Sequence, residues 1–288
     1  NSSSASTPPT LKKISYGRVT LETDETTKVF ISEISAVGNK WQDFYVRYAN
    51  DQIVPDALIN SYNTSYLSGI VNNQKNSSHY TSPEGTYYIE DERETSESAL
   101  SLNIQNLQPG HQVLLRQRLF DPYSLLSYSN IKYYFYPEAS DNNPFHPDSV
   151  EVVFRVGADS LNYYQASRRV AVIPYQQKMQ REDWTALSIN LQELTSMKEA
   201  FYGETSGSIT LNETRYSFKG NPTLTNVRDI YFGIYNPTDI PSPTPMNGTI
   251  YFNDLTVTDP YEDVGVARRV SLNSVFADFS TLDIDYEE

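Results

Sequence analysis

The sequence predicts a mostly β protein, a jelly-roll β-sandwich with a few short helices. The chain of 288 residues contains 23 Tyr, and Tyr favours pleated, half-buried surfaces. From Tyr87 onward, roughly ten short segments of strand character follow one another, several with clean apolar and polar alternation. Turn-forming stretches such as "QPGH" and "KGNPT" separate them. Many short strands, regular turns and few helices are typical of a sandwich.

The part of the chain before the expected sandwich reads as a mixture of elements. Residues 1–10 look like a polar linker, and residues 11–86 like a strand-and-helix segment, which suits the tail of a preceding β-unit. Within it, "ISYGRVTLE" and "KVFISEISAV" are expected strands. The stretch "NKWQDFYVRYA" suits either one face of a helix or an irregular strand. Pro55 and Asp56 predict the start of a short helix.

The jelly-roll sandwich is expected over residues 87–260, followed by a strand-like extension over residues 261–288. In "SVEVVFRVG" every second residue from Val150 is apolar, so these side chains are expected to face the core. Glu151 and Arg155 then lie on the opposite face. "LTSMKEAF", residues 194–201, has helical composition and interrupts the series of strands.

The stretch "NGTIYFNDLTV" carries an amide and a carboxylate, Asn253 and Asp254, at its centre. Ile250 and Phe252 face one way, whereas Leu255 faces the other. The apolar phase flips at Asn253-Asp254, which predicts a β-bulge or a strand end buried on both faces. A buried carboxylate there needs an Arg, a pair of backbone N–H groups or Ca²⁺ as its partner.

A similar stretch, "KVFISEISAV", places Glu33 where the other has Asp254. It is either a second copy of a module's last strand or a chance likeness between two ordinary strands. Another acidic segment, "IEDERETSES", is either a solvated edge with Arg93 as internal partner or a cation site that includes Asp91. Asp254 and Asp91 are therefore candidate ligands of a structural calcium ion, and the sequence indicates no other cofactor.

Composition excludes several classes of function. The net charge of −14 and pI near 4.6 disfavour binding to nucleic acid or to anionic lipid. The absence of Cys excludes disulfides and thiolate catalysis. No apolar run long enough for a transmembrane helix occurs. The three His occupy polar loop contexts, and no catalytic motif is present, so we expect a protein that is not an enzyme.

Four long stretches resemble the SprA (Sov) family: "YYIEDERETSESALSLNIQNLQPGHQ", "DPYSLLSYSNIKYYFYPE", "GNPTLTNVRDIYFGIYNP" and the segment from "GTIYFNDLTV" to the end of the chain. The resemblance covers residues 87–288. It implies a non-enzymatic soluble region of a very large outer-membrane protein of the Bacteroidetes, the translocon of the type IX secretion system. That system serves gliding motility and surface-protein export. Expected partners are other secretion-system or cell-surface proteins, and the expected location is the bacterial outer membrane or cell surface.

Two other hypotheses follow from the closing strands "VRDIYFGIYN" and "GTIYFNDLTV", which resemble those of jelly-roll, carbohydrate-binding-type sandwiches. One is a surface carbohydrate-binding module or adhesin with glycan partners. The other is a jelly-roll glycoside hydrolase or lyase. In many such modules an acidic residue near the last strand helps bind a structural calcium ion, and Asp254 matches that position. Both ends of the chain look cut, so we expect a piece of a longer protein.

Overall fold

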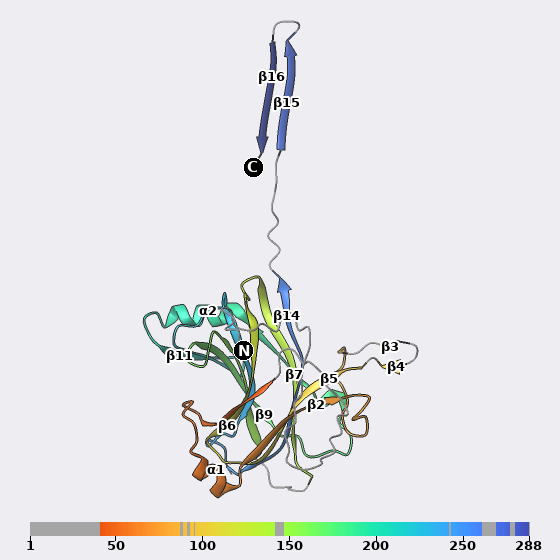
Figure 1. Ribbon diagram of the computed structural model, residues 1–288, viewed down its shortest axis with the longest axis vertical. Helices are drawn as coiled ribbons and strands as arrows, with labels where there is room; N and C mark the ends of the chain where they lie inside the picture. Colours follow the sequence, from red (N-terminus) through yellow and green to blue (C-terminus); the bar gives the residue numbers. More distant parts are fainter. Residues whose placement is uncertain are drawn as a thin grey trace, which may run out of the picture. The chain divides into compact units, whose positions relative to one another are not determined.

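The computed structural model describes residues 41–86, 89–90, 93–94, 96–141, 147–241, 243–260, 269–276 and 280–287. Two antiparallel sheets pack face to face and form the expected jelly-roll β-sandwich (Figure 1). The strands expected within residues 11–37, including the stretch that resembles "NGTIYFNDLTV", lie outside the described residues.

The larger sheet has seven strands, in the order β1 (Gln42–Tyr48), β6 (His111–Tyr123), β13 (Val227–Tyr235), β8 (Ser149–Gly157), β9 (Tyr163–Ala171), β12 (Thr214–Lys219) and β11 (Ser206–Leu211). The smaller sheet has five, in the order β10 (Thr185–Asn190), β7 (Tyr128–Ala139), β14 (Met246–Pro260), β5 (Ser98–Leu107) and β2 (Ser65–Asn72). Two separate two-stranded sheets join β3 (Ile89–Glu90) with β4 (Arg93–Glu94), and β15 (Arg269–Phe276) with β16 (Ser280–Glu287).

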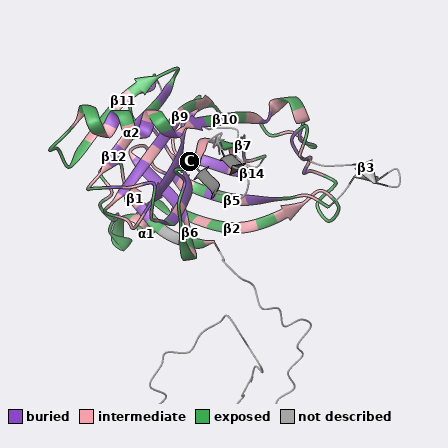
Figure 2. Cartoon of the chain, turned by 90° about the horizontal axis from the view of Figure 1, so that it is seen from above, coloured by how far each residue is buried: buried purple, intermediate pink, exposed green. Residues whose placement is uncertain are grey.

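Aromatic rings from both sheets form the centre of the core. The ring of Phe232 on β13 stacks on that of Phe252 on β14, with centroids 4.6 Å apart. Tyr133 on β7 lies 5.3 Å from Phe154 on β8. The alternation predicted for β8 is confirmed, since Val150 and the apolar residues at every second position after it are buried in this core. Figure 2 shows the buried residues concentrated on the strands of the sandwich.

The sandwich begins earlier in the chain than residue 87. β1 pairs with β6 at one edge of the larger sheet, and β2 pairs with β5 at one edge of the smaller one. Of the two interpretations of "NKWQDFYVRYA", the irregular strand is the one observed, because the register shifts between Asp43 and Val46 and Tyr45 has a φ of 61°. Hydrogen bonding to neighbours far along the chain therefore decides where the fold begins.

A β-bulge interrupts β14 at the predicted position. Asn253 pairs with Tyr134 and Thr256 with Lys132, so one extra residue is accommodated between them. Asp254 takes a φ of 50° there, a left-handed conformation that Asp tolerates better than most residues. The bulge is the reason that the apolar phase changes along this strand.

The helices are short and lie at the predicted places. α1 (Asp56–Tyr62) begins directly after Pro55, and α2 (Leu191–Ala200) covers most of the segment of helical composition. The side chain of Asn190 caps α2 by accepting hydrogen bonds from the backbone N–H groups of Gln192 and Glu193. A single 3₁₀ turn, η1 (Arg181–Asp183), precedes β10.

Candidate functional site

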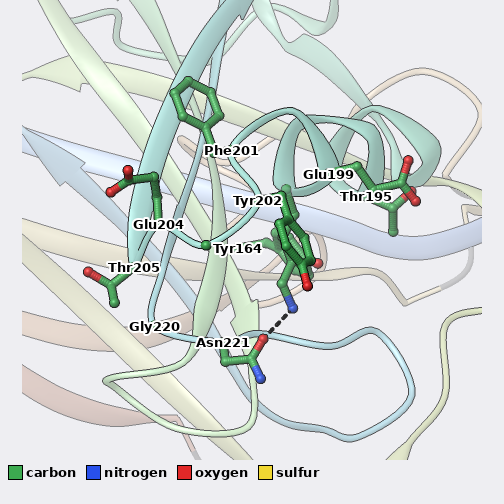
Figure 3. A pocket seen from close by; sticks show the side chains of 11 residues that line it. Tyr164, Thr195, Glu199, Phe201, Tyr202, Glu204, Thr205, Gly220 and Asn221 are labelled. Carbon is green, nitrogen blue, oxygen red and sulfur yellow. Dashed lines mark hydrogen bonds between the residues drawn. The ribbon is translucent and has the colours of Figure 1, made fainter.

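A pocket of about 680 Å³ lies between the end of α2, the loop that leads into β11 and the turn after β12. We call it the α2 pocket, and Figure 3 shows the side chains that line it. The residues that matter chemically are Lys198, Glu199, Tyr202, Glu204 and Asn221.

Two glycines shape the loops around the α2 pocket. Gly203 and Gly220 have φ values of 87° and 69°, which side chains other than glycine rarely adopt. At Gly220 a side chain would also overlap the carbonyl oxygen of Leu161. The ring of Phe201, just after α2, packs beside Phe218 on β12 with centroids 6.3 Å apart. The end of the helix is thereby held against the sheet, and the next residues form the wall of the pocket.

The polar groups of the α2 pocket differ in how far they are engaged. Lys198 donates from Nζ to Asn221 Oδ1 at 2.6 Å and to the Pro222 carbonyl at 2.7 Å, so its position is fixed. Among the described residues, the carboxylates of Glu199 and Glu204 have no ion pair or hydrogen bond. The side chain of Tyr202 is 95% exposed. The pocket therefore offers an aromatic ring and two uncommitted carboxylates to a ligand.

A second group of functional side chains lies on the face of the larger sheet that points away from the core. Asp51, in the turn after β1, accepts hydrogen bonds from Arg155 at 2.8 Å, Gln112 at 3.1 Å and Lys219 at 3.3 Å, and also from the hydroxyl of Tyr163. We call these five residues the Asp51 network. The guanidinium of Arg155 also lies over the Tyr163 ring, 4.5 Å from its centre.

Electrostatics make the Asp51 network a structural unit. The Arg155 side chain is only 4% exposed, so its charge must be matched within the protein. Burial alone would raise the pKa of the Asp51 carboxyl. The charge of Arg155 and hydrogen bonds from Tyr163 and Arg155 outweigh burial and lower that pKa below its ordinary value. Asp51 therefore stays ionised and ties the turn after β1 to β8, β9 and β12.

A pair formed by a half-buried His and a buried carboxylate lies on the outer face of the smaller sheet. His79 Nε2 is 2.9 Å from the carboxylate of Glu138, which also accepts from the backbone N–H of Gln176 at 3.1 Å. The imidazole stacks on the ring of Tyr175, with centroids 5.5 Å apart. The hydrogen bond to Glu138 raises the pKa of His79, although burial works in the opposite direction. This pair fastens the loop around His79 to β7.

The comparison with protein-family models decides which family the chain belongs to. Residues 6–287 match the family SprA_N, described as a motility-related or secretion protein. The chain is a member of the SprA_N family. The resemblance predicted from the sequence is thereby confirmed, and with it a role related to motility or secretion. No curated protein matches the chain.

Solved structures that resemble this SprA_N chain are distant. A family 11 carbohydrate-binding module from Clostridium thermocellum, in complex with a mixed-linked β-1,3-1,4 tetrasaccharide, has a TM-score of 0.39 and 11% identity, over 81% of this chain and 95% of the module. An exo-β-agarase has a TM-score of 0.38 and 13% identity, over 79% of this chain and 26% of the enzyme. Because both TM-scores lie below 0.5, the likeness carries no argument about ligand or function.

The two calcium ligands predicted from the sequence have different outcomes in the SprA_N chain. Asp91 lies outside the described residues. Asp254 is exposed at the bulge of β14 and lines a pocket of about 320 Å³. The charge of Asp254 also acts on Glu97. The pKa of Glu97 is raised, because burial and the charge of Asp254 outweigh a hydrogen bond from Asn253. No group of three or more His, Asp or Glu placed for a metal occurs in the described ranges, so calcium binding stays a prediction.

Sequence reasoning missed the residues that the fold uses most. The change of apolar phase does mark Asn253, and its side chain has a specific role, since it donates to the buried Tyr80 hydroxyl at 3.0 Å. The sequence does not indicate that Asp51, Arg155 and Glu138 belong to networks. Their partners lie far away along the chain, and a local pattern carries no signal of such pairing. Among the described residues, no helix combines the length and apolar character that crossing a bilayer requires.

Proposed function

We propose that this chain is a non-enzymatic region of a SprA-like bacterial outer-membrane translocon of the type IX secretion system, and that it serves protein export to the cell surface. The observation that carries the proposal is the family match, which extends over residues 6–287 and so includes the whole sandwich. The outer membrane or the cell surface is the proposed location. The proposed partners are other secretion-system or cell-surface proteins.

Two charge pairs that are engaged within the fold support a role without catalysis for these groups. Arg155 and Asp51 satisfy each other, and the carboxylate of Glu138 is held by His79 and by a backbone N–H group. Groups that act on a substrate need a free acceptor or donor directed at it. These groups instead join loops to sheets, which is what a rigid platform for binding partners requires.

An in-frame deletion tests the proposed function. The codons for residues 41–260 are removed from the parent gene in the source bacterium, and the exported proteins on the cell surface are quantified together with gliding on agar. We expect both to fall strongly while immunoblots show the parent protein still present in the outer membrane. The proposal is wrong if export and gliding stay at the wild-type level in cells that hold the shortened protein at normal abundance.

A carbohydrate-binding module or adhesin is the second candidate function, because one observation favours it. Tyr202 presents an almost fully exposed ring beside a pocket that also holds Glu204 and Asn221. An exposed aromatic face with nearby hydrogen-bonding groups suits the apolar face and hydroxyls of a sugar. A glycan array probed with the wild-type chain and with Tyr202→Ala tests it. Binding that Tyr202→Ala abolishes would support this candidate, and the absence of binding to any polysaccharide would count strongly against it.

A further inference from the structure

β11 is an edge strand of the larger sheet, and its turn determines which backbone groups are free. The two turn residues Asn212 and Glu213 have φ values of 46° and 65°, as in a type I′ hairpin, and join β11 directly to β12. In such a hairpin Leu211 and every second residue before it bond to the partner strand. The Gly220 N–H donates to the Thr205 carbonyl at 2.7 Å, and Thr205 belongs to the same alternate set of residues as Leu211.

The residues between those positions therefore direct their N–H and C=O groups away from β12. They are Ser206, Ser208 and Thr210, and all three are exposed. In the described part of the chain, no strand lies beyond β11, and none of the three has a further partner. Figure 2 shows β11 as largely exposed. The outer edge of the larger sheet thus carries a row of unused backbone donors and acceptors.

Nothing in the sequence of β11 protects this edge. Proteins usually prevent strand addition with charged side chains, Pro or a bulge. The strand reads "SGSITL", without a charge or a proline, and its register with β12 has no shift. β1, at the opposite edge of the same sheet, carries Arg47 and a register shift. β11 is therefore suited to receive another strand.

The α2 pocket begins where this edge begins. Glu204 and Thr205 line the pocket and directly precede Ser206, the first residue of β11. A segment that adds to β11 and continues past Ser206 thus comes to Glu204 and enters the pocket that Tyr202 and Glu199 also line; Figure 3 shows Glu204 and Glu199 on opposite sides of Tyr202. Within the described part of the chain these carboxylates have no ion pair or hydrogen bond, and Lys198, the cation of the pocket, is already held by Asn221 and the Pro222 carbonyl. The pocket therefore favours a cationic side chain, which gains an ion pair and a cation–π contact. The net charge of −14 favours a basic segment as well.

We propose that β11 binds an extended segment of a partner protein as an additional strand of the larger sheet, and that the α2 pocket holds a lysine or arginine side chain of that segment. Main-chain hydrogen bonds to Ser206, Ser208 and Thr210 supply affinity, and the pocket supplies selectivity. This inference goes beyond the proposed role in export. It can fail while the deletion result stands, because it concerns one strand and one pocket.

Synthetic peptides test the strand addition. The wild-type chain is titrated against a tethered Lys-Thr-Val-Thr-Val-Lys peptide and against the same peptide with Glu at both ends, so that either strand direction is covered. Ser208→Pro removes a donor that the ladder to β12 does not use, whereas Ser208→Ala keeps it. We expect binding of the Lys peptide, about tenfold weaker binding by Ser208→Pro, and unchanged binding by Ser208→Ala. In wild type, the Ser208 and Thr210 amides should exchange more slowly with peptide present, a readout independent of the proline variant.

A charge-matched pair of double variants tests the pocket. Glu199→Gln/Glu204→Gln should remove most of the preference for the Lys peptide over the Glu peptide. Glu84→Gln/Glu182→Gln changes the net charge equally, at exposed positions outside the pocket and outside β11 and its turn, and should retain that preference.

Several results would overturn the proposal. One is equal affinity of wild type and Ser208→Pro for the Lys peptide with no change in amide exchange, and another is no binding by wild type. A wild-type dimer that Ser208→Pro converts to monomer would instead identify a second copy of the chain as the occupant. Glycan binding that depends on Tyr202, without peptide binding, would assign the pocket to a sugar.

Discussion

Removing the charge of Asp51 should destabilise the sandwich far more than removing an exposed charge. In Asp51→Ala, the nearly buried guanidinium of Arg155 loses its counter-ion, and among the residues that the structure describes it keeps two glutamine side chains as hydrogen-bond partners. Breaking a buried pair in this way costs about 3–5 kcal/mol. For a protein of this size, each kcal/mol lowers Tm by about 2–4 °C, so we expect a fall of roughly 6–20 °C.

Asp51→Asn separates charge from shape. Asn tolerates the left-handed φ of 69° at this position, so the turn after β1 is preserved. The variant keeps hydrogen-bonding atoms but lacks the carboxylate charge, and we expect its free energy of unfolding to fall by about 1.5–3 kcal/mol. The matched control is Glu213→Gln, which removes the exposed partner of Arg168 and should cost less than about 1 kcal/mol. Urea denaturation followed by circular dichroism measures all three variants.

The pH dependence gives the Asp51 prediction a second test. The folded-state pKa of Asp51 is lowered, so its stabilising contribution is present above the ordinary value of 3.8 and is lost as pH falls toward the lower folded pKa. The gap in unfolding free energy between wild type and Asp51→Asn should narrow over that acidic range. If the free energy of unfolding of Asp51→Ala lies within about 1 kcal/mol of the wild-type value at neutral pH, the cost of breaking a buried ion pair is absent and the reasoning is refuted.

Three further predictions concern other parts of the sandwich. The pKa of His79 is raised in the folded state, so its pairing with Glu138 stabilises the fold fully at pH values below the unfolded pKa near 6.5. That stabilisation is lost as pH rises through the folded pKa. An NMR titration of His79 with a midpoint at or below 6.5 would contradict this. If Asp254 binds calcium, Ca²⁺ at 100 times Kd adds about 2.7 kcal/mol to the free energy of unfolding. Tm in Ca²⁺ should then exceed Tm in chelator by about 5–10 °C. Coincident melting curves reject the site. Gly248→Ala places a methyl group against the backbone carbonyl of Glu138 and should lower the free energy of unfolding by at least about 1–3 kcal/mol. At Gly69 the neighbour is the Ser101 hydroxyl, which can rotate away. Gly69→Ala should therefore destabilise the protein less in the same denaturation assay.

The features that local patterns encode were predictable from the sequence. The core-facing side of β8 follows from its apolar residues at every second position, α1 from Pro55 and Asp56, and the bulge of β14 from the change of apolar phase at Asn253-Asp254. Each of these signals lies within about a dozen neighbouring residues. The fold class follows because the same signals recur along most of the chain.

The features that depend on distant pairing were not predictable. Arg155 was expected on the face opposite the core and does lie there, yet it is buried, because Asp51 and Tyr163 close over it. β1 and β2 belong to the sandwich because their partners β6 and β5 present open edges. The α2 pocket is formed by loops that meet only when β11 and β12 pair. Local patterns in a single sequence do not indicate such contacts between distant residues.

The strand order has a consequence for how the chain acquires its structure. β13 lies between β6 and β8, and β14 lies between β7 and β5, although both come late in the chain. A chain that emerges from its N-terminus first therefore holds both sheets as separate halves until residues 227–260 arrive. Forming contacts over such long sequence separations is slow, and the unpaired strand edges can form non-native pairs or aggregate in the meantime. Neither sheet of the sandwich is continuous before β13 and β14 take their places, so the two sheets can be completed only late.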